Sequence, residues 1–436
     1  MKKLLPFACF ILILSACNNG DQDKSDFKVA VPGDETESIA SMPAKKLALD
    51  QWTYIEIDSN KAMWGEFDEP EWLRYFGLAA GDMNDDGLAD IITGRNIYYN
   101  PGGDLSSNWK KEDLGLNVDA NLFMTRVTDG PTIIAEALPD VYAFYRDQDS
   151  GELTKRLVAQ VPPTGHHNGQ GYRTASLRGG MFDDIILASQ GGLYVIEPMD
   201  YGLEYDENGE EYLVGDEDNA WPVTLVAQDA SDEGFAVADM DGDNDLDIVS
   251  GYRVPGKDAE VPTVVVWWEN PAENGFIDTL WARHEVGNTQ FATDRVEAAD
   301  LNGDGLTDVV VAEERYPGLE PDASLYVYFQ QSGGSFKRAT IVTQFSMNNL
   351  DVADLDQDGD LDLTTAEHKG EALTLQIWEN DGEGKFNKLV IDTGKESHLG
   401  ARTVDIDGDG DLDIISIGWD QHKYVHLWRN DAIKGM

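Results

Sequence analysis

The stretch Asp405-Ile-Asp-Gly-Asp-Gly-Asp-Leu-Asp-Ile-Ile415 places five carboxylates within nine residues and then turns apolar. The same pattern recurs upstream in residues 82–90, 239–247, 300–308 and 354–362. Its shared form is D-x-[DN]-x-D-[GN]-x-x-D. Because the five copies share one register, coincidence is excluded. Similar segments that recur along a chain indicate a protein built from structural repeats.

The chemistry of the repeated loop is that of a calcium site. Ca²⁺ takes about six to eight oxygen ligands, and here positions 1, 3, 5 and 9 offer side-chain oxygens and position 7 its carbonyl. Glycine at position 6 permits a sharp turn with positive φ, which Asn244 also tolerates. The loops therefore predict up to five structural calcium ions rather than a catalytic metal. The predicted ligands are Asp82, Asn84, Asp86, Asp90, Asp239, Asp241, Asp243, Asp247, Asp300, Asn302, Asp304, Asp308, Asp354, Asp356, Asp358, Asp362, Asp405, Asp407, Asp409 and Asp413.

The interval between the first two copies holds two further units. Residues 176–184 precede an apolar Ile-Ile-Leu-Ala run, in the position of a loop that has lost its ligands, and residues 125–134 are a shorter degenerate copy. Each unit contains four predicted strands, A to D, which in the sixth unit cover 350–353, 361–366, 373–380 and 386–392. The last unit lacks a strand D, whereas residues 52–57 have that pattern and no unit of their own. We therefore expect an all-β ring of seven units, closed by the N-terminal strand.

These repeats resemble the FG-GAP/VCBS-repeat family of seven-bladed β-propellers, the fold of the integrin α-chain head. The resemblance covers about residues 50–434. It implies four-stranded blades around a channel, with strand A nearest the axis. It also implies that the A–B connections, which carry the metal loops, lie on one face, here called the metal-loop face. The D–A and B–C connections then surround the channel on the opposite face, here called the mouth face.

Composition limits the partners. The chain has 32 Lys and Arg against 82 Asp and Glu, a formal net charge of −50. Nucleic acid binding requires a basic surface, and an anionic membrane repels an acidic one. We therefore expect neither nucleic acid nor a membrane surface as a partner of the folded body, which we expect to be a monomer.

The N-terminus has the form of a signal peptide, because Lys2 and Lys3 precede an apolar run at residues 4–14. Residues 14–17, Leu-Ser-Ala-Cys, resemble the lipobox of bacterial lipoproteins. The resemblance implies removal of residues 1–16 and lipidation of Cys17; the alternative is an ordinary signal with a chance cysteine. Asn18 favours the outer membrane, with the periplasmic or external side left open. No disulfide is expected, because Cys9 is removed and Cys17 is lipidated.

Residues 17–46 are polar, with scattered Pro and Gly, and predict a flexible tether between the lipid and a propeller at 47–436. Beyond the signal, no apolar run approaches the roughly 18 residues of a membrane span. The lipid anchor is therefore the only membrane contact that we expect.

The predicted mouth face concentrates the unusual side chains, including five of the seven histidines. Histidine and tyrosine suit acid–base chemistry, and arginine suits a carboxylate. The candidate catalytic residues are His166, His167, His368, His398, His422 and Tyr75. The candidate substrate-binding residues are Arg74, Arg253, Arg315, Arg402, Lys369, Lys423 and Trp72, of which Arg402 lies within a strand A and can instead line the channel.

Four aromatic residues have two possible roles, and two histidines are expected to have only a structural role. Trp64, Phe67, Trp72 and Tyr75 share one D–A connection, where they can stack on a sugar ring or form a local core. His284 and His426 fall within predicted strands, and we expect them to be structural.

A second resemblance concerns function. Residues 264–271, 367–369 and 398–402 resemble bacterial propellers related to aldos-2-ulose dehydratases, which eliminate water from oxidised or anhydro sugars. Propeller-fold polysaccharide lyases likewise use His and Tyr, with an Arg for the uronate. The resemblance implies a carbon–oxygen lyase that degrades oligosaccharides or polysaccharides, anionic ones included. His166 or His167 would be the base, and His398, His368 or His422 the acid or a ligand of an additional divalent metal.

The rival hypothesis is a non-catalytic propeller that presents the same face to a glycan or a protein. A hydrolase lacks an identifiable carboxylate pair in the sequence. Fold-level resemblance alone does not decide between catalysis and binding.

Overall fold

The computed structural model describes residues 46–61, 75–126, 130–147, 149–164, 169–179, 183–189, 191–199, 202–205, 211–214, 220–255, 263–271, 280–397 and 399–433. The chain divides into two units, Met1–Pro43 and Ala44–Met436, and every described residue belongs to the second. The predicted signal peptide, Cys17 and almost all of the predicted tether therefore lie outside the described residues. The described part of the chain contains strands and no helix, hence no helix suited to crossing a membrane.

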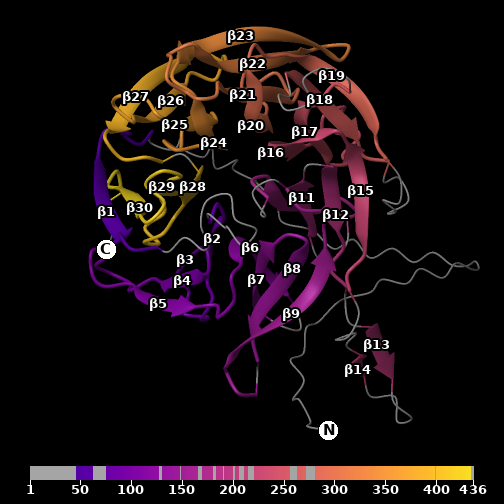
Figure 1. Cartoon of the computed structure of the whole chain (residues 1–436). Coiled ribbons are helices and arrows are strands. Elements are labelled where there is room, and N and C mark those ends of the chain that lie inside the picture. The colour runs from indigo at the N-terminus through magenta and orange to yellow at the C-terminus, as the bar shows by residue number, and fades with distance from the viewer. Residues whose placement is uncertain are drawn as a thin grey trace, which may run out of the picture. The chain divides into compact units, whose positions relative to one another are not determined.

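Seven four-stranded antiparallel sheets form a ring around one axis (Figure 1). Blade 1 contains β2 (Leu78–Gly81), β3 (Asp90–Thr93), β4 (Asn96–Tyr99) and β5 (Lys110–Asp113). Blade 2 contains β6 (Asp119–Arg126), β7 (Gly130–Ala137), β8 (Asp140–Arg146) and β9 (Leu153–Gln160). Blade 3 contains β10 (Tyr172–Ala175), β11 (Asp184–Ser189), β12 (Gly192–Ile196) and β15 (Val223–Gln228), and the separate hairpin β13 (Gly202–Tyr205) and β14 (Glu211–Val214) interrupts it.

The remaining blades repeat this order. Blade 4 contains β16 (Ala230–Ala238), β17 (Asp247–Tyr252), β18 (Val264–Glu269) and β19 (Ala282–Asn288). Blade 5 contains β20 (Ala292–Ala299), β21 (Asp308–Glu314), β22 (Ala323–Gln331) and β23 (Ser335–Gln344). Blade 6 contains β24 (Met347–Ala353), β25 (Asp362–Glu367), β26 (Leu375–Asn380) and β27 (Phe386–Asp392). Blade 7 contains β28 (Leu399–Val404), β29 (Asp413–Ile417), β30 (Val425–Asn430) and β1 (Trp52–Asp58).

The hydrophobic core lies between neighbouring blades. Each second strand is buried along most of its length, as in β21, where Val309, Val310 and Val311 are fully buried. One face of β21 packs against blade 4 and the other against Leu350 and Leu363 of blade 6. Because both faces of each blade are covered, these strands are continuous β-branched or aliphatic runs rather than alternating ones.

The N-terminal strand closes the ring, as the sequence predicts. Strand β1 pairs antiparallel with β30, and Trp52 lies opposite Asn430. The Tyr54 hydroxyl lies 3.0 Å from His426 Nδ1 in the neighbouring strand. His426 is buried and its pKa is lowered to about 4, chiefly by burial, so it supports the closure as a neutral ring.

Charged side chains fill the axis of the propeller. A cavity of about 30 Å³ lies there, and its walls include Arg173, Arg295, Arg402 and Glu297. Arg173 donates a hydrogen bond to Glu297, and the Arg402 guanidinium lies 5.8 Å from the centre of the Tyr172 ring. Arg402 therefore lines the channel, the second of its two predicted positions.

Candidate functional site

The five repeated loops share one backbone conformation. Position 6 has positive φ in every copy, from 74° at Asn244 to 99° at Gly359 and Gly410, as the sequence predicts. Position 4 also has positive φ in every copy, including the non-glycine residues Asp85 and Gln357. Paired left-handed residues fold the loop back on itself and bring its acidic side chains together.

The position 1 carboxylates organise each loop from within. In the loop at 82–90, Asp82 accepts hydrogen bonds from the backbone N–H groups of Asp86 and Gly87, at 3.1 and 2.7 Å. In the loop at 300–308, Asp300 accepts the equivalent bonds at 3.2 and 2.8 Å. The turn is therefore defined by side-chain-to-backbone bonds that leave further carboxylate lone pairs for a cation.

The position 9 aspartate joins the loop to strand C. Asp413 is fully buried, and it accepts one bond from the Ile406 N–H at 2.9 Å and another from the Asn430 N–H at 2.7 Å. The same two bonds recur at the other four copies, where the buried acids are Asp90, Asp247, Asp308 and Asp362. These residues are predicted ligands that also have a structural role, which the motif alone does not reveal.

Amide side chains at the ends of strands C connect neighbouring blades. Asn380 donates to the Leu301 carbonyl of the preceding metal loop at 2.9 Å, and Gln330 donates to the Met240 carbonyl at 2.8 Å. Asn100 and Asn270 make equivalent bonds to Ile406 and Leu177. These residues were not predicted from the sequence, although an amide after an aromatic-rich strand C recurs in Tyr-Tyr-Asn, Trp-Trp-Glu-Asn and Ile-Trp-Glu-Asn.

Carboxylates in three of the loops converge closely enough to hold a metal ion. Oxygens from positions 1, 3 and 9 lie within 4.8 Å of one another in the loops that begin at Asp239, Asp354 and Asp405. The other two loops have asparagine at position 3. Burial raises the pKa of Asp247 and Asp362 to about 7 and that of Asp413 to about 8, and nearby loop carboxylates add to each shift. Crowded oxygen donors of this kind fit Ca²⁺.

Several predicted residues of the mouth face lie outside the described residues. They are His166, His167, His398, Arg74 and Trp72, together with Trp64 and Phe67. The convergence of these histidines in one pocket therefore stays a prediction.

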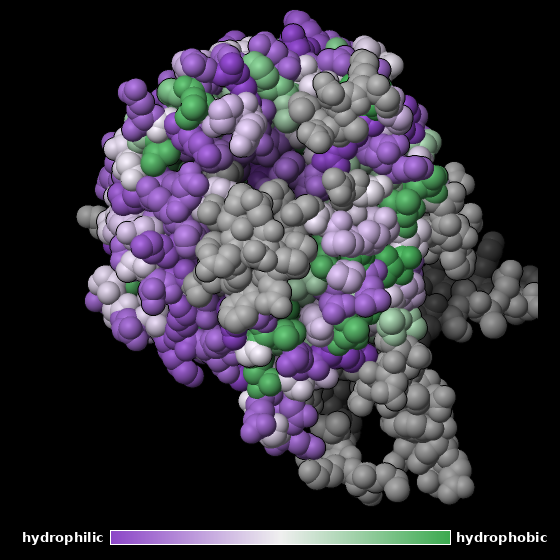
Figure 2. Space-filling model, viewed as in Figure 1, coloured by the Kyte–Doolittle hydropathy of each residue, from purple (hydrophilic) through white to green (hydrophobic). Residues whose placement is uncertain are grey.

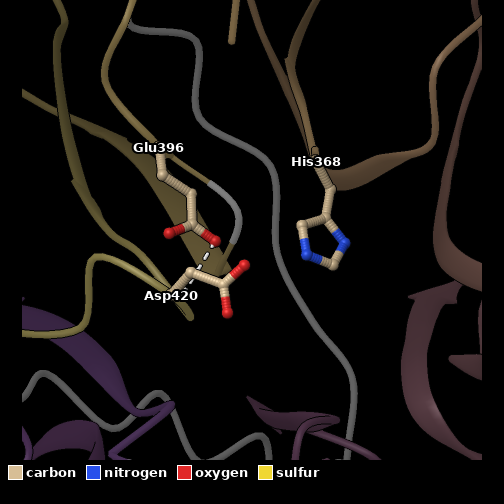
Figure 3. A group of neighbouring side chains, drawn as sticks. All are labelled: His368, Glu396 and Asp420. Atoms are coloured by element: carbon tan, nitrogen blue, oxygen red, sulfur yellow. Dashed lines mark hydrogen bonds between the residues drawn. The ribbon is translucent and has the colours of Figure 1, made fainter. Parts of the chain in front are cut away.

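Three donors from three connections meet at the mouth face (Figure 3). They are His368 from the B–C connection of blade 6, Glu396 from the D–A connection between blades 6 and 7, and Asp420 from the B–C connection of blade 7. One ligand atom from each lies within 4.8 Å of the other two. His368 and Glu396 are buried, whereas 55% of the Asp420 side chain is exposed, so the group is open to solvent on one side.

Backbone groups fix the orientation of Glu396. Its Oε1 accepts hydrogen bonds from the N–H groups of Trp419 and Asp420 at 3.2 and 3.0 Å, and its Oε2 accepts one from Gln421 at 2.5 Å. The His368 N–H donates to the Ser346 carbonyl at 2.7 Å, which holds its loop against blade 6. Both oxygens of this carboxylate are therefore oriented by backbone donors of the connection that carries Asp420. No sequence motif marks Glu396, and only the fold brings it beside His368.

A second acidic group continues from His368 toward blade 4. Its members are Glu233, Asp294 and Glu314, with Arg295 in the middle: Arg295 Nη1 lies 3.9 Å from Glu233, and Arg295 Nε lies 3.6 Å from Asp294. His368 Nδ1 lies 3.9 Å from Glu314. Burial raises the pKa of all three acids, that of Asp294 to about 7, and the neighbouring carboxylates raise that of Glu233 further. Carboxyl groups that titrate near neutral pH can give or accept a proton.

Three of the predicted substrate-binding cations are paired with acids. Arg253 donates to Asp232, Arg315 Nε lies 3.1 Å from Asp322, and Lys369 Nζ lies 3.7 Å from Asp420. Each pairing joins residues that are remote in the sequence or separated by a turn. These cations are therefore partly neutralised before any anionic ligand arrives.

The other predicted side chains of this face differ in exposure. Tyr75 is buried beneath Lys61, whose ammonium lies 5.8 Å from the centre of its ring, and burial raises the pKa of the Tyr75 hydroxyl. Lys423 is exposed and His422 is half-buried.

His284, expected to be structural, stacks on Trp267 with ring centres 4.2 Å apart. Hydrophilic side chains predominate over blades 6 and 7 on the face seen in Figure 2.

Comparison with known proteins identifies the repeats. A family model for the FG-GAP-like repeat matches residues 300–365 and 354–416. No curated protein matches the chain. Among solved structures, the chain is similar to a lectin of Agrocybe aegerita described as recognising non-reducing terminal N-acetylglucosamine. That match has 18% sequence identity and a TM-score of 0.45, and it covers 74% of this chain and 81% of the lectin chain.

Proposed function

We propose that the protein binds glycans at its mouth face through a divalent metal held by His368, Glu396 and Asp420. The observation that carries this proposal is the approach of three donors, from three separate connections, to within 4.8 Å. An imidazole with two carboxylates is a ligand set used for divalent transition metals. The backbone donors around Glu396 supply the orientation that metal ligands need.

A glycan fits the charges of this face. Because Arg253, Arg315 and Lys369 already contact acids, they attract a substrate carboxylate less strongly than isolated cations would. A divalent ion beside exposed Asp420 would supply the missing positive charge for a uronate carboxylate or a pair of hydroxyls. The partly exposed carboxylates of Glu233 and Glu314 alongside can accept hydrogen bonds from sugar hydroxyls.

We further propose that the bound glycan undergoes β-elimination, as in a carbon–oxygen lyase of dehydratase or polysaccharide-lyase type. This step needs a base for the proton next to a carbonyl or carboxylate and an acid for the leaving oxygen. Asp294, whose pKa is raised by burial to about 7, is a group that can exchange protons at neutral pH, and burial also raises the pKa of neighbouring Glu233 and Glu314. His166, His167 and His398 remain further candidates for the same roles.

Absorbance near 235 nm tests catalysis, because elimination creates a conjugated double bond. The protein is mixed with a panel of uronate and ulose oligosaccharides, with Zn²⁺, Mn²⁺ or Ca²⁺ or with a chelator. We expect absorbance to grow with metal, and His368→Ala to abolish it. His284→Ala is the matched control, because that histidine lies on strand β19 in contact with Trp267. Equal rates in both variants would exclude the proposed site.

A glycan-binding propeller without catalysis is the second candidate. The observation that favours it is the pairing of Arg253, Arg315 and Lys369 with acids. Cations that are already paired polarise a substrate carboxylate less, and β-elimination depends on that polarisation. Isothermal titration separates the two candidates. Saturable, metal-dependent binding without new absorbance across the panel would establish binding alone, whereas no binding to any glycan would contradict both.

We also propose that the metal loops hold structural calcium and that Cys17 anchors the protein to the outer membrane. The residues fit calcium by their converging oxygens, and the anchor rests on the lipobox-like sequence at residues 14–17. Cys17→Ser should move the protein from the membrane to the soluble fraction after cell lysis. Membrane retention of that variant would contradict the lipid anchor.

A further inference from the structure

One metal loop differs from the other four because a lysine reaches its carboxylates. Lys46 Nζ lies 2.8 Å from Asp356, 2.6 Å from Asp358 and 2.7 Å from Glu379. Asp356 and Asp358 are positions 3 and 5 of the loop at 354–362. Among the described residues, no ion pair joins a lysine or arginine to a predicted ligand of the other four loops.

The ammonium of Lys46 uses the oxygens that a metal ion would use. An ammonium group has three donors, and here three carboxylates lie within hydrogen-bond distance. The Asp356 side chain is completely buried, so its charge has little access to solvent. The backbone next to Lys46 also contacts the loop, because the Leu47 N–H donates to the Asp356 carbonyl at 2.6 Å. The residues just before β1 are therefore joined to blade 6 through the loop itself.

Blade 3 provides an internal precedent for a side-chain cation in this position. Its degenerate loop at 176–184 has Arg178 at position 3, where the metal loops have Asp or Asn. Arg178 donates to the position 9 aspartate, Asp184, from Nε at 2.9 Å and from Nη2 at 2.6 Å. There the cation is built into a loop that has lost the acids of positions 1, 3 and 5 and keeps only that of position 9 among the ligand positions. Lys46 instead enters a loop that keeps all of its acids, so its place can also be taken by a metal.

We propose that Lys46 is a tethered counter-ion that competes with calcium for the loop at 354–362. Calcium binding there displaces the ammonium and breaks the Leu47–Asp356 contact, and the segment before β1 is released from blade 6. This loop is consequently the weakest of the five calcium sites and couples calcium concentration to the attachment of the N-terminal segment. The inference rests on the proposed calcium binding but not on the mouth face.

Calorimetric calcium titration of the whole protein tests the competition. Lys46→Gln should tighten the weakest site by about tenfold, because one competing positive charge at short range is removed. Lys385→Gln is the matched control, because Lys385 pairs with Asp381 and Glu383 in the same blade but outside the loop. In an Asp354→Asn background, Lys46→Gln should no longer change calcium affinity, which assigns the effect to this loop.

Hydrogen exchange provides the second measurement. Calcium should accelerate exchange of the Leu47 amide in the wild-type protein, whereas the Ile55 amide within β1 should not change. Unchanged weak-site affinity in Lys46→Gln, or unchanged Leu47 exchange on calcium saturation, would overturn the role of Lys46. Failure of all five loops to bind calcium would overturn the calcium premise instead, so the two failures are distinguishable.

Discussion

The two faces of this propeller use the same acidic residue types in different ways. On the metal-loop face, all five loops repeat the bond from the position 6 N–H to the position 1 carboxylate and the position 9 bridge exemplified by Asp413. On the mouth face, the part of the chain that the structure describes contains one such group of potential metal ligands, formed by His368, Glu396 and Asp420. Repetition is expected where every blade has the same mechanical need, because each must fix the same turn. A ligand binds the ring at one place, so the residues that contact it need not recur in every blade.

The largest expected effect is a loss of catalytic turnover when an acid of the mouth face is replaced, because only that face is proposed to be catalytic. Asp294→Asn on the mouth face should lower turnover by about 10²–10⁴-fold, the usual contribution of a general acid or base. Its melting temperature should change little, because the amide has nearly the same shape and a carboxyl group with a pKa near 7 is already partly neutral at pH 7. Initial rates and thermal unfolding measure the two effects. Full activity of this variant would remove Asp294 from the catalytic proposal.

Calcium removal should have the largest effect on stability. Each ion that binds only the folded state adds about 2.7 kcal/mol at 100 times its dissociation constant, so excess chelator should lower the melting temperature substantially. Asp409→Ala should produce a smaller share of that decrease, and its effect should be much smaller once the metal is already removed, when only the bond from the Asp411 N–H is lost. A melting temperature that is the same with and without chelator would contradict structural calcium.

Position 9 should behave differently from position 5 within one loop. Asp413→Ala leaves the Ile406 and Asn430 N–H groups buried without their acceptor, which should cost about 1–3 kcal/mol for each group left unsatisfied. Unlike that of Asp409→Ala, this loss should persist in chelator. Urea unfolding with and without calcium compares the two variants. Equal behaviour of both would mean that the position 9 bridge has no role beyond metal binding.

The connections between blades should contribute a smaller amount. Asn380→Ala removes the bond to the Leu301 carbonyl of the neighbouring blade and a second bond to the Leu361 carbonyl, and it should destabilise the protein by about 1 kcal/mol or slightly more. Asn387→Ala is the control, because Asn387 lies in the same blade and makes only a long, exposed contact with Glu379. Denaturant midpoints measure both. Equal midpoints would show that the bond between blades contributes nothing measurable.

The smallest expected effect is the pH dependence of the metal-free protein. Burial raises the pKa of Asp362 to about 7 and that of Asp413 to about 8, both above their unfolded values. The folded state therefore binds more protons than the unfolded state between about pH 4 and pH 8, and stability should fall as pH rises through that window. Saturating calcium should flatten this slope, because the metal takes the place of the protons. A metal-free protein that becomes more stable from pH 5 to pH 8 would contradict the prediction.

The sequence predicts the metal-loop face well because residues close together in the sequence determine the conformation of each loop. A nine-residue motif defines the turn, and even the positive φ of Asn244 follows from its place in the register. The closing pair of β1 and β30 follows from counting strands. The second role of Asp413 was not predicted, because a motif names the residue and not its backbone partners.

The mouth face could be predicted only in part, because its pairings join distant segments. The sequence places Arg253 near the mouth as a binding residue, but not beside Asp232, the acid that contacts it. Glu396 stands in no motif, and its role depends on three backbone donors that arrive from another connection. Which acid meets which base is decided by blade packing, and one sequence carries little information about it.

The closure of the ring by β1 and β30 also sets an order of events in folding. Thr53 contacts Asp431 across 378 residues of chain, so the last sheet cannot form until the final blade has been synthesised. Contacts this distant in sequence form slowly. Until β1 pairs with it, strand β30 presents an unpaired edge, the kind of edge that recruits strands from other chains. The last step of assembly is therefore the time at which this chain is most exposed to misassociation.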